Sequence, residues 1–187
     1  MKFEPLFKSV NNKLVKIENE TAFSTENLFE VDIDKTFGEN ALFPVEKDIL
    51  TAVKVDWEKV DFGGENYNEE ALAGLRDYLK KFEENGQFAF IVPGTKKEIS
   101  DADTADSYIR AMVHTARRIK DCVSVIGFAI PDELIAKDSV FDENSYSQWF
   151  INEMNVKHGH YLYFASKAKL IALNLMEKAE KTSFVFY

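Results

Sequence analysis

The pattern of hydrophobic and polar residues changes near residue 48. Before it, apolar and polar residues alternate in two short segments, KLVKIE (13–18) and LFEVDID (28–34). Alternation of this kind predicts short, half-buried strands, and a hairpin is one way in which they could pair. From residue 48 onward, apolar β-branched segments alternate with segments of helical periodicity. The pattern therefore predicts one domain over 1–187, made of an N-terminal β-rich segment (1–47) and a region of strand–helix units (48–187).

Four apolar segments of the second region have the composition of buried strands: ILTAVKVDW (49–57), QFAFIVPG (87–94), CVSVIGFAI (122–130) and SFVFY (183–187). Two capped helices are predicted between them, 69–84 after Asn68 and 104–120 after Asp103. Helical segments also fill about 141–181, with a break near His158. Strand–helix–strand repetition of this length predicts an α/β fold of βαβ units with a parallel sheet.

Composition and charge limit the partners. With 187 residues, 45% hydrophobic and 13% aromatic, the chain can bury a sizeable core. The net charge of −9 disfavours nucleic-acid backbones and anionic membrane surfaces, so we expect neither as a partner. The single cysteine, Cys122, excludes an internal disulfide and is expected to be a buried, inert thiol.

The sequence leaves the cellular location of the protein open. The first ten residues, MKFEPLFKSV, contain no long apolar region of a signal peptide. The apolar stretch LIALNLM is far shorter than the roughly 20 residues that a membrane span needs. A cytoplasmic location is the default, and a secreted one applies if a leader has been removed.

Three segments resemble parts of a (β/α)8 glycoside hydrolase of the cellulase and mannanase clan, clan A. They are AVKVDWEKVDFGGENYNEEALAGLRDYLKKFEENGQFAFIV, ADSYIRAMVHTARRIKDCVSVIGFAIPDEL and HYLYFASKAKLIALNLMEKAEKTSFVFY. Together they cover about 48–187. The resemblance implies an incomplete TIM barrel preceded by a short β segment, since a full barrel takes at least about 200 residues. It implies a protein that acts on or binds β-linked carbohydrate.

The resemblance also implies a site. Glu133 aligns with the general acid/base of the clan, and a carboxyl at a strand end can protonate a glycosidic oxygen. Asp132 stands where the clan has asparagine, and Lys54 falls near the position of its arginine. Trp57, at the end of an earlier strand, would stack on a sugar ring. The clan's nucleophile belongs to a later strand, which this chain does not reach.

Each candidate has a structural alternative. Asp132 and Glu133 also suit the first turn of a helix, where acidic side chains interact favourably with the macrodipole. Trp57 also suits a partly buried loop anchor. His158 and His160 lack a nearby third ligand, so we expect no metal site and no cofactor. Two function classes remain open: a glycoside hydrolase, and a non-catalytic descendant of the fold that binds carbohydrate or protein.

An incomplete barrel leaves the inward-facing apolar side chains of its strands without an opposite wall. Strand segments such as FAFIV (88–92) and SVIGFA (124–129) would then be exposed to water at a large energetic cost. Either the N-terminal segment 1–47 folds back over them or a second copy of the chain covers them as a homodimer. The strand-like alternation of KLVKIE and LFEVDID favours the first arrangement.

Overall fold

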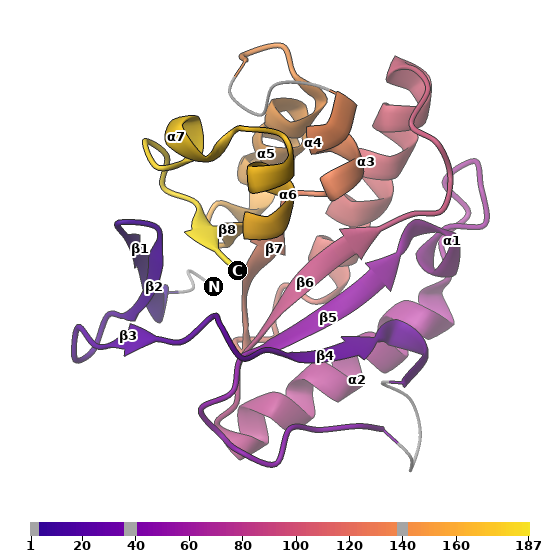
Figure 1. Cartoon of the computed structure of the whole chain (residues 1–187). Coiled ribbons are helices and arrows are strands. Elements are labelled where there is room, and N and C mark those ends of the chain that lie inside the picture. Colours follow the sequence, from indigo (N-terminus) through magenta and orange to yellow (C-terminus); the bar gives the residue numbers. More distant parts are fainter. Residues whose placement is uncertain (1–3, 36–40, 138–141) are drawn as a thin grey trace.

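The computed structural model describes residues 4–35, 41–137 and 142–187. Its centre is a parallel sheet of six strands in the order β4-β5-β6-β7-β8-β9 (Figure 1). The strands are Phe29–Asp32 (β4), Thr51–Asp56 (β5), Ala89–Gly94 (β6), Val125–Ala129 (β7), Leu162–Ala165 (β8) and Val185–Phe186 (β9). Each strand pairs in parallel with the next one along the chain, as in a barrel. Within the described residues the sheet does not close, because β4 and β9 are its two edges.

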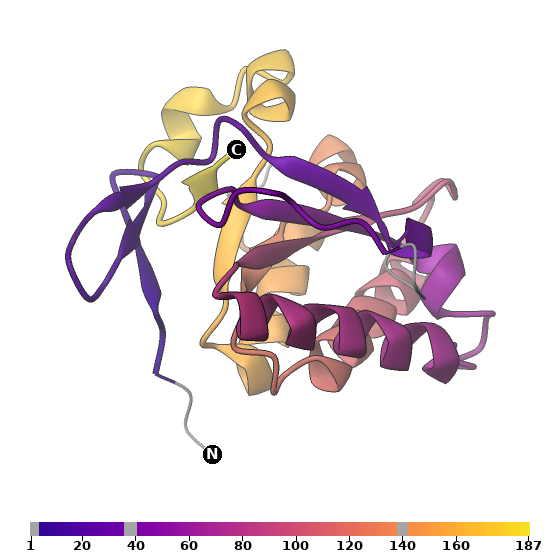
Figure 2. The same ribbon diagram turned by 90° about the horizontal axis from the view of Figure 1, so that it is seen from below.

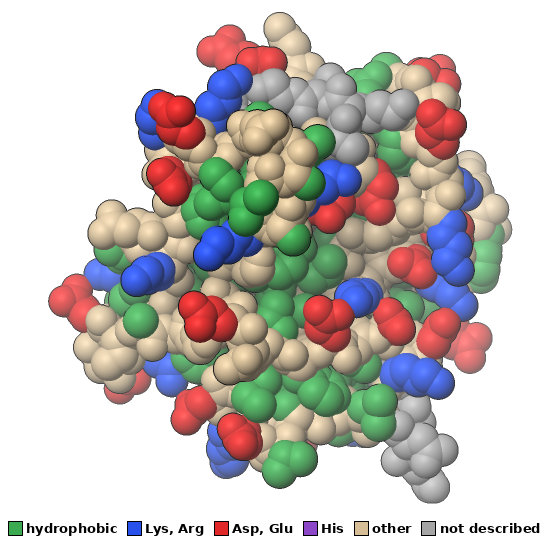
Figure 3. Space-filling model, in the orientation of Figure 1, with side chains coloured by type: hydrophobic (Ala, Val, Ile, Leu, Met, Phe, Trp, Pro, Cys, Tyr) green, Lys and Arg blue, Asp and Glu red, His purple; other side chains and the backbone are tan. Residues whose placement is uncertain are grey.

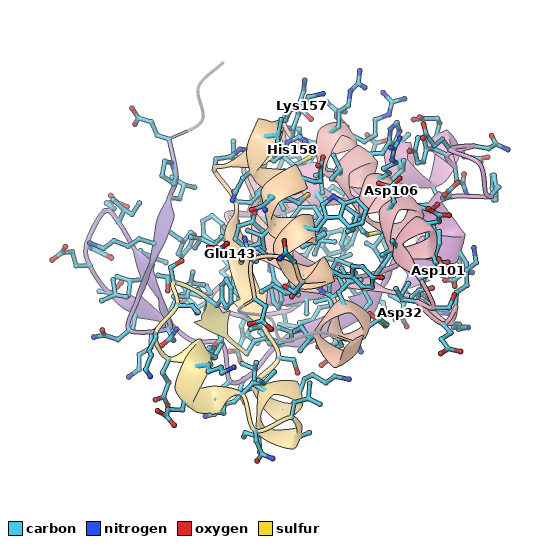
Figure 4. All side chains as sticks on the ribbon, turned by 90° about the horizontal axis from the view of Figure 1, so that it is seen from above. Asp32, Asp101, Asp106, Glu143, Lys157 and His158 are labelled. Atoms are coloured by element: carbon cyan, nitrogen blue, oxygen red, sulfur yellow. The ribbon has the colours of Figure 1, made fainter. Side chains whose placement is uncertain are left out.

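Helices cover one face of this sheet (Figure 2). They are Trp57–Val60 (α1), Glu69–Asn85 (α2), Ala102–Arg118 (α3), Asp132–Lys137 (α4), Tyr146–His158 (α5), Lys167–Ala172 (α6) and Met176–Ala179 (α7), with a short 3-10 turn at Ile33–Lys35. α5, which carries Lys157 and His158, lies beside α3, which carries Asp106 (Figure 4). The apolar sides of the helices pack against the sheet and form the main core with it. No helix of the described chain has the length and apolar character of a membrane span.

The opposite face of the sheet is covered by the N-terminal segment. Phe7–Val10 (β1), Lys13–Lys16 (β2) and Ala22–Phe23 (β3) form an antiparallel sheet of three strands. Side chains of this small sheet share a second core with inward side chains of the large one: Phe7, Leu14, Phe23, Leu50, Ala52, Phe90, Ile126, Ala129, Phe164 and Val185. The Asn12 side chain adds hydrogen bonds to the carbonyl oxygens of Thr182 and Phe184, at 3.0 and 2.9 Å. The structure thus has the N-terminal cover that the sequence favoured, but within the described residues β1–β3 form it; the segment LFEVDID, which was also assigned to the cover, supplies β4 of the large sheet instead.

The helix predictions are confirmed in place, and one cap is corrected. Asn68 caps α2 by accepting a hydrogen bond from the Ala71 amide at 3.1 Å. α3 starts two residues earlier than predicted, and its cap is Asp101 rather than Asp103, with 2.8 Å to the Thr104 amide. Both aspartates are plausible caps by residue type. The break near His158 is also confirmed, because α5 ends there.

The predicted hairpin between segments 13–18 and 28–34 is wrong. β2 pairs with β1 and β3, whereas β4 pairs in parallel with β5. The parallel sheet therefore begins at Phe29 and not near residue 49. The alternation in β4 has another cause: Val31 is buried against the helix-side core, while Glu30 and Asp32 are exposed on an edge strand.

β8 lies inside the region that the sequence predicted to be helical. Its four residues follow α5 after a short turn, and they pair with β7 and β9. Gly127 lets β8 approach closely, because a Cβ atom at this position would lie 2.1 Å from the carbonyl oxygen of Leu162. A four-residue strand has too little periodicity to be told from part of a helix.

Candidate functional site

The carboxyl-terminal ends of β5, β6 and β7 meet at a cavity of ≈ 200 Å³. We call it the strand-end cavity; its lining residues are Lys54, Asp56, Val92, Pro93, Gly94, Ile130, Asp132, Glu133 and Tyr187. Parallel strands bring their carboxyl ends to one edge, which is where ligands bind in open α/β sheets and in barrels. Acidic side chains lie among basic and apolar ones on this side of the molecule (Figure 3).

Glu133 reaches the cavity from the first turn of α4, which starts directly after β7 and Pro131. Its Oε1 accepts a hydrogen bond from the Thr95 amide at 3.4 Å. Its Oε2 is buried and has no hydrogen-bond partner among the described residues. Burial raises the pKa of Glu133, and the neighbouring charge of Asp132 adds to the rise, while the Thr95 amide and Lys169 oppose it.

Asp132 shares this environment. Burial raises the pKa of its carboxyl, with Lys169 acting in the opposite direction. Its Oδ1 is buried and makes no hydrogen bond within the part of the chain that the structure describes. Both acids open a helix, as the structural alternative required, and both also line the cavity. The two interpretations are therefore compatible.

Lys54 and Asp56 enter the cavity from β5. The Lys54 ammonium lies 2.5 Å from Oε2 of Glu30 on the edge strand β4. This hydrogen bond raises the pKa of Lys54, with smaller contributions from Asp32 and Asp56. Lys54 therefore lies on the β4 side of the cavity as a cation paired with Glu30.

Trp57 is placed differently from the other candidates. It begins α1, its side chain is 5% exposed, and its indole nitrogen donates to Oδ2 of Asp61 at 3.0 Å. Its ring stacks on Tyr108 with centroids 5.4 Å apart, and the Lys97 ammonium lies 4.1 Å from its centroid. Trp57 shares the sheet edge with Glu133 but does not line the cavity. The structure brings Lys54, Asp132 and Glu133 together and holds Trp57 as a buried anchor.

Sequence reasoning missed several residues of this edge. Asp56 and Tyr187 line the cavity, and each stands at a predicted strand end, which was the available signal. Glu58 was also missed: its Oε1 accepts hydrogen bonds from the Thr95 hydroxyl at 2.6 Å and from the amides of Lys96 and Lys97 at 3.1 and 3.2 Å. Burial opposes the ionisation of Glu58, but these bonds outweigh it and lower the pKa. Among the described residues, no group of three His, Cys, Asp or Glu side chains is arranged to hold a metal.

The buried carboxyl of Glu133 predicts a pH-dependent stability. Because the folded state raises its pKa, the neutral form is favoured, and stability falls as the pH rises through the folded-state pKa. We expect Glu133→Gln to melt about 2–4 °C above the wild type at pH near 8, for roughly 1 kcal/mol regained, and to match it near pH 4. Thermal unfolding followed by circular dichroism across this range measures the effect. An equal loss of stability at every pH would contradict it.

Comparison with known proteins identifies solved structures with a similar fold. No protein-family model matches this chain, and no curated protein matches it. Among solved structures, endo-glycoceramidase II from Rhodococcus sp. superposes with a TM-score of 0.58 at 9% identity, covering 87% of this chain and 52% of that one. That protein was solved with a cellobiose-like isofagomine and as a lactosyl-enzyme intermediate.

A GH5_18 protein from Bifidobacterium longum subsp. infantis superposes with a TM-score of 0.47 at 10% identity, covering 62% of this chain and 34% of that one. The present chain thus spans about half of the Rhodococcus protein and about a third of the Bifidobacterium protein. At these identities the similarity concerns architecture. The chain has an α/β fold like that of clan A glycoside hydrolases, with a six-stranded parallel sheet that does not close into a barrel within the described residues.

Proposed function

We propose that this protein is a glycoside hydrolase-like protein that acts on a β-linked carbohydrate in the strand-end cavity, with Glu133 as general acid/base. One observation carries the proposal: Glu133 lies just beyond β7 in the cavity, in surroundings that favour its protonated form. A carboxylic acid that stays neutral toward the working pH can donate a proton to a leaving oxygen. The barrel-like fold supports the location, since its sites lie at this edge.

The other side chains of the cavity supply complementary chemistry. Asp56 and Asp132 are carboxylates that accept hydrogen bonds from sugar hydroxyls. Glycoside hydrolysis also needs a second carboxylate, as nucleophile or as base for water, and these two are the candidates within the cavity. Such a reaction uses two carboxyl groups and water. Lys54 would contact hydroxyl oxygens from the β5 side.

A non-catalytic carbohydrate-binding role is the second candidate, and Asp132 favours it. The clan that the sequence resembles has asparagine at this position, whereas Asp132 adds a titrating charge directly beside Glu133. Both roles share the ligand class and the cavity. They differ only in turnover.

We expect β-linked disaccharides, cellobiose or mannobiose, to bind at the strand-end cavity. Titration of the isotope-labelled full chain, followed by amide NMR shifts, should perturb Gly94, Thr95 and Asp132 first. A uronic acid should bind about tenfold more weakly, because the acidic side chains of Asp56 and Asp132 in the lining disfavour a further negative charge. Lys13→Ala, an exposed change on β2, is the matched control and should bind like the wild type.

The outcomes separate the two candidates. Binding with release of monosaccharide supports the hydrolase, and binding without turnover supports the non-catalytic role. Shifts confined to residues far from the cavity, or no shifts with any of the sugars, would contradict both.

A further inference from the structure

Three consecutive strand ends are joined through one residue, Thr95. Glu58 follows β5, Thr95 follows β6, and Glu133 follows β7. The Thr95 hydroxyl donates to Oε1 of Glu58 at 2.6 Å, and the Thr95 amide donates to Oε1 of Glu133 at 3.4 Å. The two glutamates therefore lie on either side of the turn that leaves β6.

Glu58 holds this turn in a defined shape. Its Oε1 accepts hydrogen bonds from the amides of Lys96 and Lys97 in addition to the Thr95 hydroxyl. The Lys97 amide also donates to the Thr95 hydroxyl oxygen at 3.0 Å. Three donors on one carboxylate oxygen stabilise its ionised form and fix the backbone that supplies them. The direction of the Thr95 amide is set by the same backbone.

We propose that Glu58 is a positioning residue for Glu133: ionised Glu58 fixes the turn Thr95–Lys97, and the turn aims the Thr95 amide at Glu133. The inference rests on the proposed role of Glu133, and it assigns to Glu58 the control of how that carboxyl is held. Glu58 is not among the residues that line the strand-end cavity, so it acts through Thr95 and not on the ligand.

The second carboxylate oxygens of Glu58 and Glu133 agree with this arrangement. Oε2 of Glu58, Oε2 of Glu133 and the hydroxyl of Tyr108 are all buried without hydrogen-bond partners within the described part of the chain. Tyr108 is fully buried, and both glutamates raise the pKa of its hydroxyl after the larger effect of burial. Two ionised carboxylates around such a site would be costly. Within the described part of the chain, the hydrogen bonds favour ionisation of Glu58, which accepts from three donors, over that of Glu133, which accepts the long bond from Thr95.

The two ways in which Glu58 could influence Glu133 have opposite signs. In the intact protein, the hydrogen bond from the Thr95 amide lowers the pKa of Glu133. If Glu58 acts through the turn, loss of its side chain weakens this hydrogen bond, and the pKa of Glu133 rises. If it acts through its own negative charge, loss of that charge lowers the pKa of Glu133. The other groups around Glu133 stay constant in this comparison: Asp132, Lys169, Tyr108, Asp56, Lys54 and Tyr187.

The test is a carboxyl-carbon NMR titration of the full chain without any ligand. The Glu133 resonance is assigned by its loss in Glu133→Gln. We expect Glu58→Ala to raise the pKa of Glu133 by about half to one pH unit. Glu58→Gln, which keeps an acceptor oxygen for the turn, should raise it less. Glu84→Ala, on the exposed side of α2, is the control and should leave it unchanged.

A lowered or unchanged pKa of Glu133 in folded Glu58→Ala would overturn the proposal. Thr95→Val provides a second test if Glu58→Ala does not fold, because it removes only the two contacts of the Thr95 hydroxyl, with Glu58 and with the Lys97 amide. It should also raise the pKa of Glu133, and no change there would overturn the proposal. The titration is read without substrate, so absence of hydrolysis or sugar binding would remove the proposed function and leave this result standing.

Discussion

Replacing Glu133 by glutamine is expected to lower the rate of hydrolysis of an unactivated β-linked disaccharide by about 10²–10⁴-fold, the usual contribution of general acid catalysis. Glutamine keeps the shape and can keep the contact with the Thr95 amide, but it has no acidic proton to transfer to the leaving oxygen. The loss should be smaller with a nitrophenyl β-glycoside, because its leaving group departs without protonation. Steady-state rates on the two substrates measure the difference. Equal losses on both would show that Glu133 does not act as the acid.

The pH profile gives an independent check on the same residue. Because the folded structure raises the pKa of Glu133, wild-type activity should fall as the pH rises through that folded-state pKa. Asp132→Asn removes a charge that contributes to the rise, so the fall should move to lower pH while the acid remains. Glu133→Gln should lose this limb of the profile. A limb that survives in Glu133→Gln would have to be assigned to another group.

Helices α2 and α3 could be predicted from sequence because the signals are local. In α2, Leu72, Leu75, Leu79 and Phe82 repeat at helical spacing and are all buried. Asn68 and Gly86 mark its two ends, and Gly86 has the left-handed conformation that ends many helices. Neither signal needs information from distant parts of the chain.

The strands β4 and β8 were harder to predict than helices α2 and α3, because the pairing of each strand depends on distant partners. Residues 28–34 have the alternation of a hairpin strand, but β4, which they contain, pairs in parallel with β5. β8 is short and is stabilised by β7 and β9 on its two sides. Its approach to β7 requires Gly127, whose role becomes visible only with both strands in place.

The candidate site was predictable in part. The strand-end position of Glu133 follows from the βαβ order, and Asp132 comes with it as its neighbour. The surroundings of Trp57 do not follow, because they are made by Tyr108 and Lys97 from other elements. Glu58 has no sequence signal that separates it from the many other acidic residues of the chain. Its contacts with residues 95–97 arise only when the ends of β5 and β6 lie side by side.

The N-terminal sheet is expected to be essential for solubility. Deleting residues 4–23 removes β1–β3 and uncovers Phe90, Ile126 and Phe164, which are 0–7% exposed in the intact protein. Each newly exposed large apolar side chain forgoes about 1.5–3 kcal/mol, and the sum competes with a total stability of about 5–15 kcal/mol. We expect an aggregated or unfolded product, measured by light scattering after size exclusion and by thermal unfolding.

Point variants on β2 distinguish the loss of buried apolar contacts from a general sensitivity of the N-terminal segment to mutation. Leu14 is fully buried in the second core, so Leu14→Ala should lower the free energy of unfolding by about 2–5 kcal/mol. Its neighbour Lys13 is exposed, and Lys13→Ala should change it by less than about 0.5 kcal/mol. A soluble monomer of the deletion variant that unfolds cooperatively would show that β1–β3 are not the wall of the sheet. A soluble dimer would instead mean that a second copy of the chain can replace β1–β3 by covering the exposed face of the parallel sheet.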